Sequence, residues 1–307
     1  MILLLIIVFV VCLCFRFPIA FSLGLSCLVY FIFKGTPLVV VPLKMYAGID
    51  VFVLLSIPGF IIAGNLMNQG GLTDKIIKFC NHLLGHIRGG LSYVNISASM
   101  LFAGISGTAI SDTASLGAVM IPAMKKEGYD SDFSCAITAA SSTVGPIIPP
   151  SLPMIIAATL SGLSVGKLFL AGAIPGLLLG LGLMLVAYFV AKKKNYPKHQ
   201  KSSILQILKS FTDTFWALLM TLIILFGIIG GVFTPTEASV VAVLYALFIG
   251  TFVYKKLNLK NISVVILDSM KTTASLISWF CQFVWIHTHY RTNSSTHIRT
   301  DSFMDHQ

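Results

Sequence analysis

Charged residues are scarce in this sequence. Only 10% of the 307 residues are Asp, Glu, Lys or Arg, whereas soluble domains carry roughly 25%. Hydrophobic residues make up 56% of the chain, and its mean hydropathy is +0.90. The apolar runs are continuous and lack the alternation that is typical of barrel strands. The sequence therefore predicts an all-α polytopic membrane protein.

Motifs of several common enzyme classes are also lacking. The stretch "GLSVGKL" (162–168) has no glycine at position 161 and no Ser or Thr at position 168, so it is not a P-loop. No H-E-x-x-H motif occurs, and no intramembrane histidine is available as a base beside Ser106 or Ser111. The six cysteines form no C-x-x-C pair. We therefore expect no enzyme, no cofactor and no disulfide framework.

Basic residues outnumber acidic ones by 21 to 11, a formal charge of +10. They gather in short clusters between the apolar runs, notably at 192–201 and 254–261. Under the positive-inside rule these clusters are interpreted as cytoplasmic loops beside the bilayer, and not as a nucleic-acid surface.

The apolar runs predict a series of helices separated by Pro, Gly and charged residues. Residues 34–50 are expected to form a connector, and 71–90 an amphipathic helix. The expected apolar helices span residues 2–15, 18–33, 51–68, 168–191, 214–232, 236–254 and 261–280.

The stretch "AGISGTAISDTASLGA" (103–118) consists mostly of small and hydroxyl residues. Gly104 and Gly107 flank Ser106 and weaken a continuous helix, because each glycine costs about 1 kcal/mol relative to alanine. A backbone break at bilayer depth is tolerated only beside protein or a water-filled cavity. Asp112 follows the break, and an intramembrane carboxylate indicates a functional site. It is expected either to help to hold a cation or to cap a helix start.

Prolines interrupt a second stretch, "TVGPIIPPSLP" (143–153). Proline provides no backbone donor, so carbonyls one helical turn earlier are expected to lose their partners and become oxygen ligands. Such oxygens suit Na⁺ in broken-helix transporters, and the restarting helix suits an anionic substrate group. The alternative is a kink without a ligand. The candidate binding residues in and beside this break are Ser142, Thr143, Gly145, Pro146, Pro149 and Ser151.

A third polar stretch, "FTPTEAS", precedes the apolar run that begins at 236. Thr236 and Glu237 are expected to belong to a helix cap, since an acid in the first turn is favoured there. The alternative is a role in gating or coupling.

Four motifs in order resemble the large membrane subunit of tripartite ATP-independent periplasmic (TRAP) transporters, the DctM type. They are "AGISGTAISDTASLGAVMIPAMKKEGYD", "ITAASSTVGPIIPPSLPMIIAA", "LFLAGAIPGLLLGL" and "GGVFTPTEASVVAVLYAL". The resemblance implies an elevator-type secondary transporter with a re-entrant hairpin and broken helices. It would be a multi-pass protein of the bacterial inner membrane that imports organic anions, such as a C4-dicarboxylate, another carboxylate or a sialic acid, with Na⁺. It further implies two partners: a small membrane subunit of the DctQ type and a periplasmic solute-binding protein of the DctP type.

Carried over by motif, the resemblance places the tip of the first hairpin at Ser106, Gly107, Thr108 and Ala109. It places the break in the following helix at 143–151, and Na⁺ near Ser106, Gly107, Thr143 and Gly145. It divides the chain into N-terminal scaffold helices (1–89), the first half of the transport domain (90–165) and further scaffold helices (166–280), followed by a polar tail (281–307).

The sequence departs from the family after residue 165, where neither "SGTA" nor "GPIIPP" recurs. The second half of the expected inverted repeat is therefore incomplete. We hypothesise a truncated or frameshifted product whose authentic sequence ends near Ser278 and which does not transport alone. The alternative functions are another ion-coupled carrier or a channel-like membrane protein.

Overall fold

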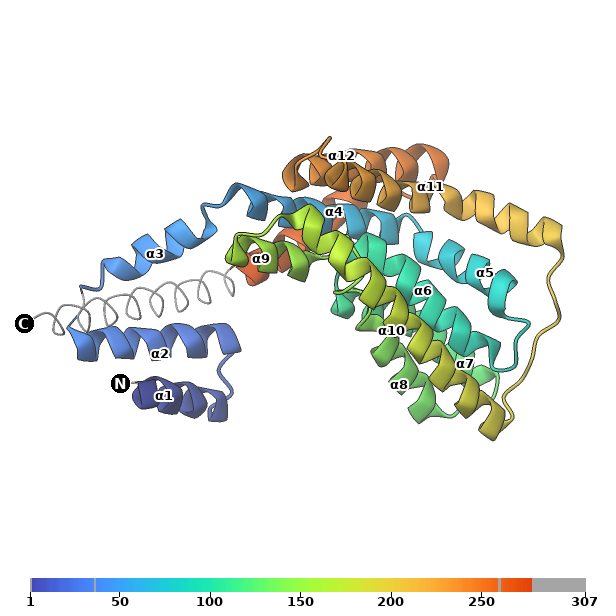
Figure 1. Ribbon diagram of the computed structural model, residues 1–307, viewed down its shortest axis with the longest axis horizontal. Helices are drawn as coiled ribbons and strands as arrows, with labels where there is room; N and C mark the ends of the chain where they lie inside the picture. Colours follow the sequence, from blue (N-terminus) through green and yellow to red (C-terminus); the bar gives the residue numbers. More distant parts are fainter. Residues whose placement is uncertain (1, 36, 259–260, 278–307) are drawn as a thin grey trace, which may run out of the picture. The chain divides into compact units, whose positions relative to one another are not determined.

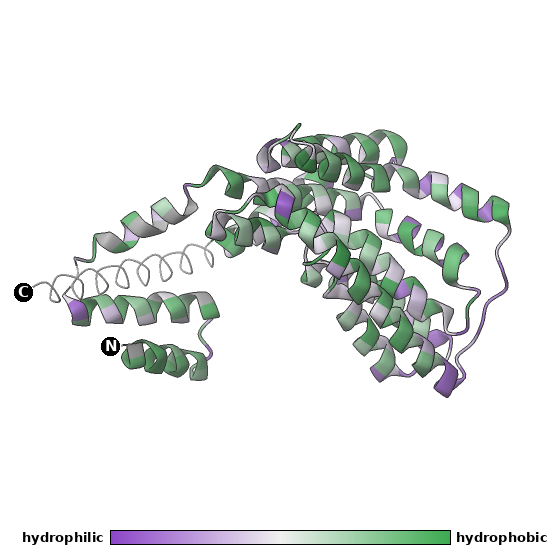
Figure 2. Cartoon of the chain, in the orientation of Figure 1, coloured by the Kyte–Doolittle hydropathy of each residue, from purple (hydrophilic) through white to green (hydrophobic). Residues whose placement is uncertain are grey.

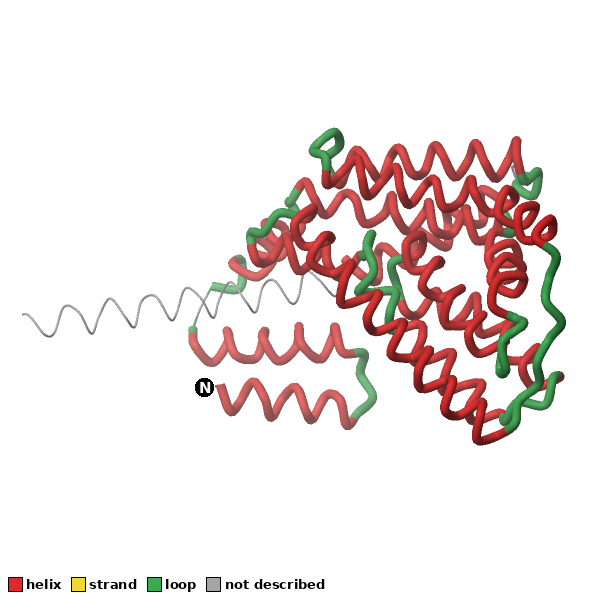
Figure 3. The backbone as a smooth tube through the Cα atoms, turned by 45° about the vertical axis from the view of Figure 1, so that its right-hand side comes forward, coloured by secondary structure: helices red, strands yellow, loops and turns green. Residues whose placement is uncertain are grey.

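The structure is a computed structural model that describes residues 2–35, 37–258 and 261–277. Every regular element in these ranges is a helix, as Figure 3 shows, which confirms the all-α prediction. The predicted polar tail, 281–307, lies outside the described residues. Contacts divide the chain into two units, residues 1–51 with 271–307, and Phe52–Met270, which are described separately.

The first unit contains α1 (Ile2–Cys14), α2 (Ile19–Lys34) and α3 (Val40–Ile49). Pro18 precedes α2, and Gly35 ends it with a φ of 68°, a conformation that favours glycine. Cys27 and Phe31 form a small buried core. The prediction of a connector over 34–50 is wrong for α3. Its Pro42 lies in the first helical turn, where proline removes no helical hydrogen bond.

The second unit begins with a 3₁₀ turn (Phe52–Leu55) and ends with a π-helical turn (Ile249–Val253). Residues 261–270 are helical and belong to this unit, and the helix continues to residue 277. In between lie α4 (Ser56–Gln69), α5 (Leu72–Leu84), α6 (Gly90–Ser106), α7 (Ala109–Lys126), α8 (Ser131–Ser142), α9 (Leu152–Ser161), α10 (Val165–Lys194), α11 (Ile204–Ile229) and α12 (Pro235–Phe248).

Helices α6, α7 and α8 pack against one another, and α10 lies along α6 and α8 (Figure 1). Helix α4 packs closely on α12, where Gly59 faces Ser239. On α10, the buried glycines 172, 176 and 180 lie against side chains of Met154, Ile148 and Met100. These small residues let α10 approach the chain segment around residue 148.

Four segments among the described residues are long and apolar enough to cross a membrane: Phe52–Gln69, Val165–Lys194, Ile204–Ile229 and Pro235–Val253. In Figure 2, α10 is green along most of its length and turns purple at its C-terminal end. The predicted start of the 214–232 helix is wrong, because α11 begins ten residues earlier. There Ser203 and Gln206 form a capping box that starts a helix before the apolar run.

Candidate functional site

The first break separates α6 from α7 by two residues. Gly107 adopts a φ of 62°, and its N–H donates to the carbonyl of Ala103 at 3.0 Å. Thr108 is extended and caps α7, since its side chain accepts from the N–H of Ser111 at 3.4 Å. Ala109 is the first residue of α7. The chain thus forms a tight helical hairpin with an interrupted tip.

Ser106 binds to the backbone of this tip. Its hydroxyl donates to the carbonyl of Thr108 at 3.2 Å and accepts from the N–H of the same residue at 3.3 Å. The Ser106 side chain therefore stabilises the break itself.

The second break follows α8 and runs from Thr143 to Ser151 as a series of turns. The N–H of Gly145 donates to the carbonyl of Ser142 at 3.1 Å. The Ser151 hydroxyl donates to the carbonyl of Pro146 at 2.6 Å and accepts from the N–H of Met154 as the cap of α9. The Pro149–Pro150 peptide bond is cis. The Pro146 carbonyl was predicted to lack a hydrogen-bond partner, because Pro150 has no N–H to donate. It has one, since the Ser151 hydroxyl donates to it instead.

The two breaks meet. A Cβ atom on Gly107 would lie 2.9 Å from the carbonyl oxygen of Pro150 and 3.4 Å from Cα of Ser151. A Cβ atom on Gly145 would lie 2.7 Å from Oδ2 of Asp112. The backbone of the second break therefore leaves no room for a side chain at Gly107, and the Asp112 carboxylate leaves none at Gly145.

Asp112 lies at this meeting point, in the first turn of α7. Its side chain is completely buried, and neither carboxylate oxygen has a hydrogen-bond partner. Its neighbours are the Ser106 side chain and Gly145. A buried carboxylate without a partner is strongly unfavourable unless it gains a cation or a proton. The residues present therefore fit a small cation.

A small cavity lies beside the breaks. Its volume is about 10 Å³, which is close to the space that one water molecule needs. Its lining combines both breaks with apolar side chains: Phe60, Ile105, Ser106, Gly107, Pro150, Ser151, Leu152 and Ile155. The space suits one water molecule or one small ion.

Two predicted ligands turn away from this point. The Ser142 hydroxyl donates to the carbonyl of Thr138 at 2.8 Å, and the Thr143 hydroxyl donates to that of Ala140 at 2.7 Å. Thr143 is exposed. The structure thus brings Ser106, Gly107, Asp112, Gly145 and Ser151 together, whereas Ser142 and Thr143 use their hydroxyl groups within α8.

A polar contact between α6 and α8 was not found from the sequence. The Asn95 amide donates to Oγ1 of Thr138 at 2.6 Å, and the Ser99 and Ser141 hydroxyls are 2.9 Å apart. The Asn95 Oδ1 atom is buried without a partner. The four-residue spacing of Asn95 and Ser99 on one helix face was the available signal. This contact fixes α8, and hence the second break, against the hairpin.

The third predicted region lies at the start of α12. Glu237 accepts from the N–H of Thr234 at 2.8 Å, and the Thr234 side chain accepts in return from the N–H of Glu237. Thr236 donates to the carbonyl of Phe52 at 2.9 Å. The geometry is that of a capping box, and a coupling role for these residues stays a prediction.

Comparison with known proteins gives a consistent set of relatives. The family model described as "Tripartite ATP-independent periplasmic transporter, DctM component" matches residues 6–284. The sialic acid TRAP transporter large permease protein SiaM of Vibrio cholerae is 44% identical over 258 residues, which are 84% of this chain and 60% of that protein. For the sialic acid TRAP transporter permease protein SiaT of Haemophilus influenzae, the values are 44% over 257 residues, 83% and 42%.

A third relative is the C4-dicarboxylate TRAP transporter large permease protein DctM of Pseudomonas aeruginosa. It is 41% identical over 257 residues, which are 83% of this chain and 60% of the relative. The chain thus spans about half the length of the curated relatives that it matches.

Proposed function

Because the chain belongs to the DctM component family of TRAP transporters, we propose that it acts as the large membrane subunit of a Na⁺-coupled importer of organic anions. The family is one of transporter components and not of enzymes. In this proposal the protein is a multi-pass protein of the bacterial inner membrane and works as an elevator. Its partners are a small membrane subunit of the DctQ type and a periplasmic solute-binding protein of the DctP type.

The observation that carries the proposal is the buried, unpartnered carboxylate of Asp112 at the meeting of two helix breaks. Na⁺ prefers oxygen ligands, and a carboxylate beside hydroxyl and carbonyl groups supplies them. The Ser106 hydroxyl and backbone oxygens near Gly107 and Gly145 are the further ligands that we propose. Bound Na⁺ would compensate the buried charge, so its binding would be coupled to the geometry of both breaks.

The substrate proposed is an organic acid. Relatives are named for sialic acid, for C4-dicarboxylates and for 2,3-diketo-L-gulonate, and all three carry a carboxylate group. Helices α7 and α9 both have their N-termini where the two breaks meet. Their dipoles favour a negative group nearby. We therefore propose that the substrate carboxylate binds close to the cation.

We propose that residues 90–165 form part of the moving transport domain and that the hairpin of α6 and α7 is re-entrant. Helices of 1–89 and 166–280 would provide the scaffold. The tight α6–α8 contact through Asn95 and Thr138 supports movement of the hairpin and the second break as one body.

The test is uptake of labelled organic acids by proteoliposomes that contain this chain, a DctQ-type subunit and a DctP-type binding protein. Uptake is measured with an inward Na⁺ gradient and with an equal K⁺ gradient. Asp112→Asn is compared with Asp132→Asn, which removes an exposed carboxylate from the first turn of α8. SiaM of Vibrio cholerae, with its own partners, serves as the positive control.

The proposal predicts Na⁺-dependent uptake that Asp112→Asn abolishes and Asp132→Asn retains. Uptake that proceeds equally with K⁺, or that survives Asp112→Asn unchanged, would contradict a Na⁺-coupled role for this site.

A further inference from the structure

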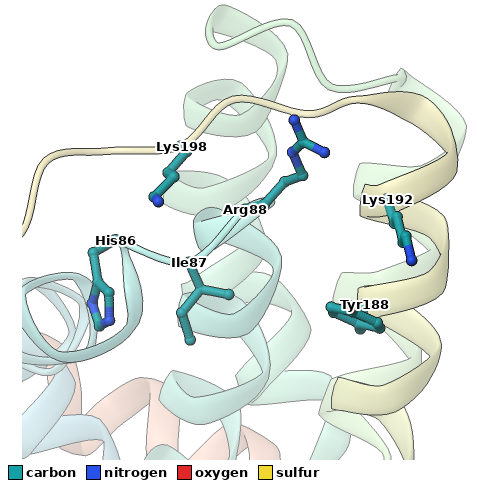
Figure 4. Close-up of a pocket in the computed structure, with 6 residues that line it drawn as sticks. All are labelled: His86, Ile87, Arg88, Tyr188, Lys192 and Lys198. Atoms are coloured by element: carbon teal, nitrogen blue, oxygen red, sulfur yellow. The ribbon is translucent and has the colours of Figure 1, made fainter.

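A second, larger cavity lies at the opposite end of α6 from the first helix break. Its volume is about 480 Å³. Three segments contribute its lining, which Figure 4 shows: the α5–α6 connection with His86, Ile87 and Arg88, the last turns of α10 with Tyr188 and Lys192, and the following connector with Lys198. Neither the helix breaks nor the proposed Na⁺ site uses any of these residues.

The walls of this cavity are held by the fold. The N–H of Gly89 donates to the carbonyl of Pro197 at 3.0 Å, and the N–H of His199 donates to that of Gly85 at 3.4 Å. Gly89 has a φ of 75° and lies directly against Ala191 of α10. Backbone hydrogen bonds therefore join the α5–α6 connection to the connector, and Gly89 packs on Ala191 of α10, so the cavity between these segments is preformed.

The cations of the lining have no acidic partner. Among the described residues, no ion pair involves Arg88, Lys192 or Lys198. The neighbouring acids have other partners, because Asp130 forms an ion pair with Lys194 at 2.9 Å and Glu127 lies within hydrogen-bond distance of the His199 ring, at 2.7 Å. The cavity thus has three uncompensated positive charges, which attract an anion with several oxygens.

The cavity also has an apolar side at the end of a membrane span. Tyr188 lies one helical turn before Lys192 on α10, and its side chain is 46% exposed. Aromatic residues followed by lysines are typical of the membrane–water interface. Ile87 adds an aliphatic side chain to the lining. In Figure 2, α10 turns from green to purple at its C-terminal end.

We propose that this cavity binds the headgroup of an anionic phospholipid. In Figure 4 the charged ends of Arg88, Lys192 and Lys198 point in different directions. The planar Arg88 guanidinium binds two phosphate oxygens at once, and the flexible Lys192 and Lys198 side chains turn toward the headgroup when it binds. Tyr188 and Ile87 contact the glycerol and the first methylene groups. Basic pockets between helices on the cytoplasmic side suit such headgroups, and the basic cluster at 192–201 is predicted to face that side.

A lipid fits better than a free phosphate ion because of this mixed lining. Inorganic phosphate needs only the cations, whereas the exposed ring of Tyr188 on an apolar helix offers a path from the bilayer. The inference does not depend on the Na⁺ site, so either proposal can fail without the other.

The test is native mass spectrometry of the protein released from nanodiscs that contain equal amounts of phosphatidylglycerol and phosphatidylcholine, with cardiolipin in a second series. The variant Arg88→Gln/Lys192→Gln/Lys198→Gln is compared with Lys167→Gln/Lys193→Gln/Lys209→Gln. The control removes three exposed lysines, one of them adjacent to Lys192, that do not line the cavity. Both sets lose three charges, so a general surface effect is matched.

We expect the wild type and the control to retain one anionic lipid per chain selectively over phosphatidylcholine. In the cavity variant the retention of anionic lipid should fall at least about tenfold, since each cation near the surface strengthens binding of an anionic lipid roughly fivefold. Lys198→Gln alone, on an exposed connector, should cost roughly fivefold and serves if the triple variant does not fold.

Three outcomes would overturn the inference. Equal loss in the cavity and control variants would show a nonspecific surface effect. In a separate thermal unfolding series in detergent, stabilisation by inorganic phosphate as strong as that by phosphatidylglycerol would identify a free phosphate ion as the ligand. An acidic peptide that displaces the lipid from the wild type at equimolar concentration would instead identify a protein partner.

Discussion

At the scale of single residues, the chemistry concentrates on Asp112. Its burial is complete and its oxygens are unpartnered, while Gly145 leaves no room between the second break and the carboxylate. A functional role for Asp112 was predictable from the sequence, because a carboxylate in an apolar membrane segment is energetically costly. Its contact with Gly145 was not predictable, since these residues lie 33 positions apart in the sequence and meet only because the two breaks pack together.

The first prediction concerns stability without sodium. Asp112→Asn should raise the melting temperature of the purified protein in sodium-free choline buffer, because the variant removes a buried charge that lacks compensation. Adding Na⁺ should stabilise the wild type and Asp132→Asn but not Asp112→Asn. Thermal unfolding in detergent measures both effects. A lower melting temperature for Asp112→Asn in choline would contradict the account.

The second prediction concerns space at the second break. Gly145→Ala should destabilise the protein by about 1 to 3 kcal/mol, because the new methyl group overlaps with the Asp112 carboxylate. Gly182→Ala on α10 is the matched control, since a Cβ atom there meets no other atom within 4 Å. In the helix interior the control should stabilise by roughly 0.5 to 1 kcal/mol. Chemical unfolding monitored by tryptophan fluorescence gives both values, and equal effects would rule out the proposed close approach.

At the scale of helices, caps decide where elements begin and end. The apolar runs predicted most helices, but the start of α11 depends on Ser203 and Gln206 rather than on hydropathy. Helix α3 formed over a predicted connector because its proline lies in the first turn. Helix boundaries depend on local hydrogen bonds made by polar residues, and the mean hydropathy of a segment does not show where these bonds form.

The third prediction separates capping from coupling at α12. Thr234→Ala should cost about 1 kcal/mol of stability, because it removes the acceptor for the N–H of Glu237. Glu237→Gln retains an acceptor oxygen for the N–H of Thr234, so it should unfold close to the wild type and retain uptake. Chemical unfolding and proteoliposome uptake are measured on both variants. Loss of uptake in a stable Glu237→Gln variant would favour a coupling role.

The fourth prediction concerns the loop between α7 and α8. Hydrogen bonds from Lys194, and then from Tyr196, hold the pKa of Asp130 below its usual value. This contact therefore contributes stability that is complete above the ordinary Asp pKa of about 3.9 and is lost as the pH falls through the lowered pKa. Between pH 6 and 8 the contact should not change.

Hydrogen exchange of the 195–199 connector, measured at several pH values and corrected for intrinsic rates, tests this expectation. Protection should decrease only in acid, and Asp130→Asn should show low protection at every pH. A decrease near neutral pH would identify a different group as the one that titrates.

At the scale of the whole molecule, the sequence predicted the family and the helical class. The motifs around the two breaks are short and contiguous, so they can be recognised in the sequence without the fold. The α6–α8 polar contact and the cavity at the end of α10 were not predicted, because they bring together residues from separate helices. The chain spans about half the length of its curated relatives. Its transport activity must therefore be measured in the presence of its proposed partners.

The most direct test of the central claim is Na⁺ binding to the purified protein by isothermal titration calorimetry in choline buffer. The account predicts that Na⁺ binds to the wild type and to Asp132→Asn, that K⁺ does not compete, and that Asp112→Asn shows no binding. Na⁺ binding of equal affinity in Asp112→Asn would contradict the claim that the two helix breaks form a cation site around this carboxylate.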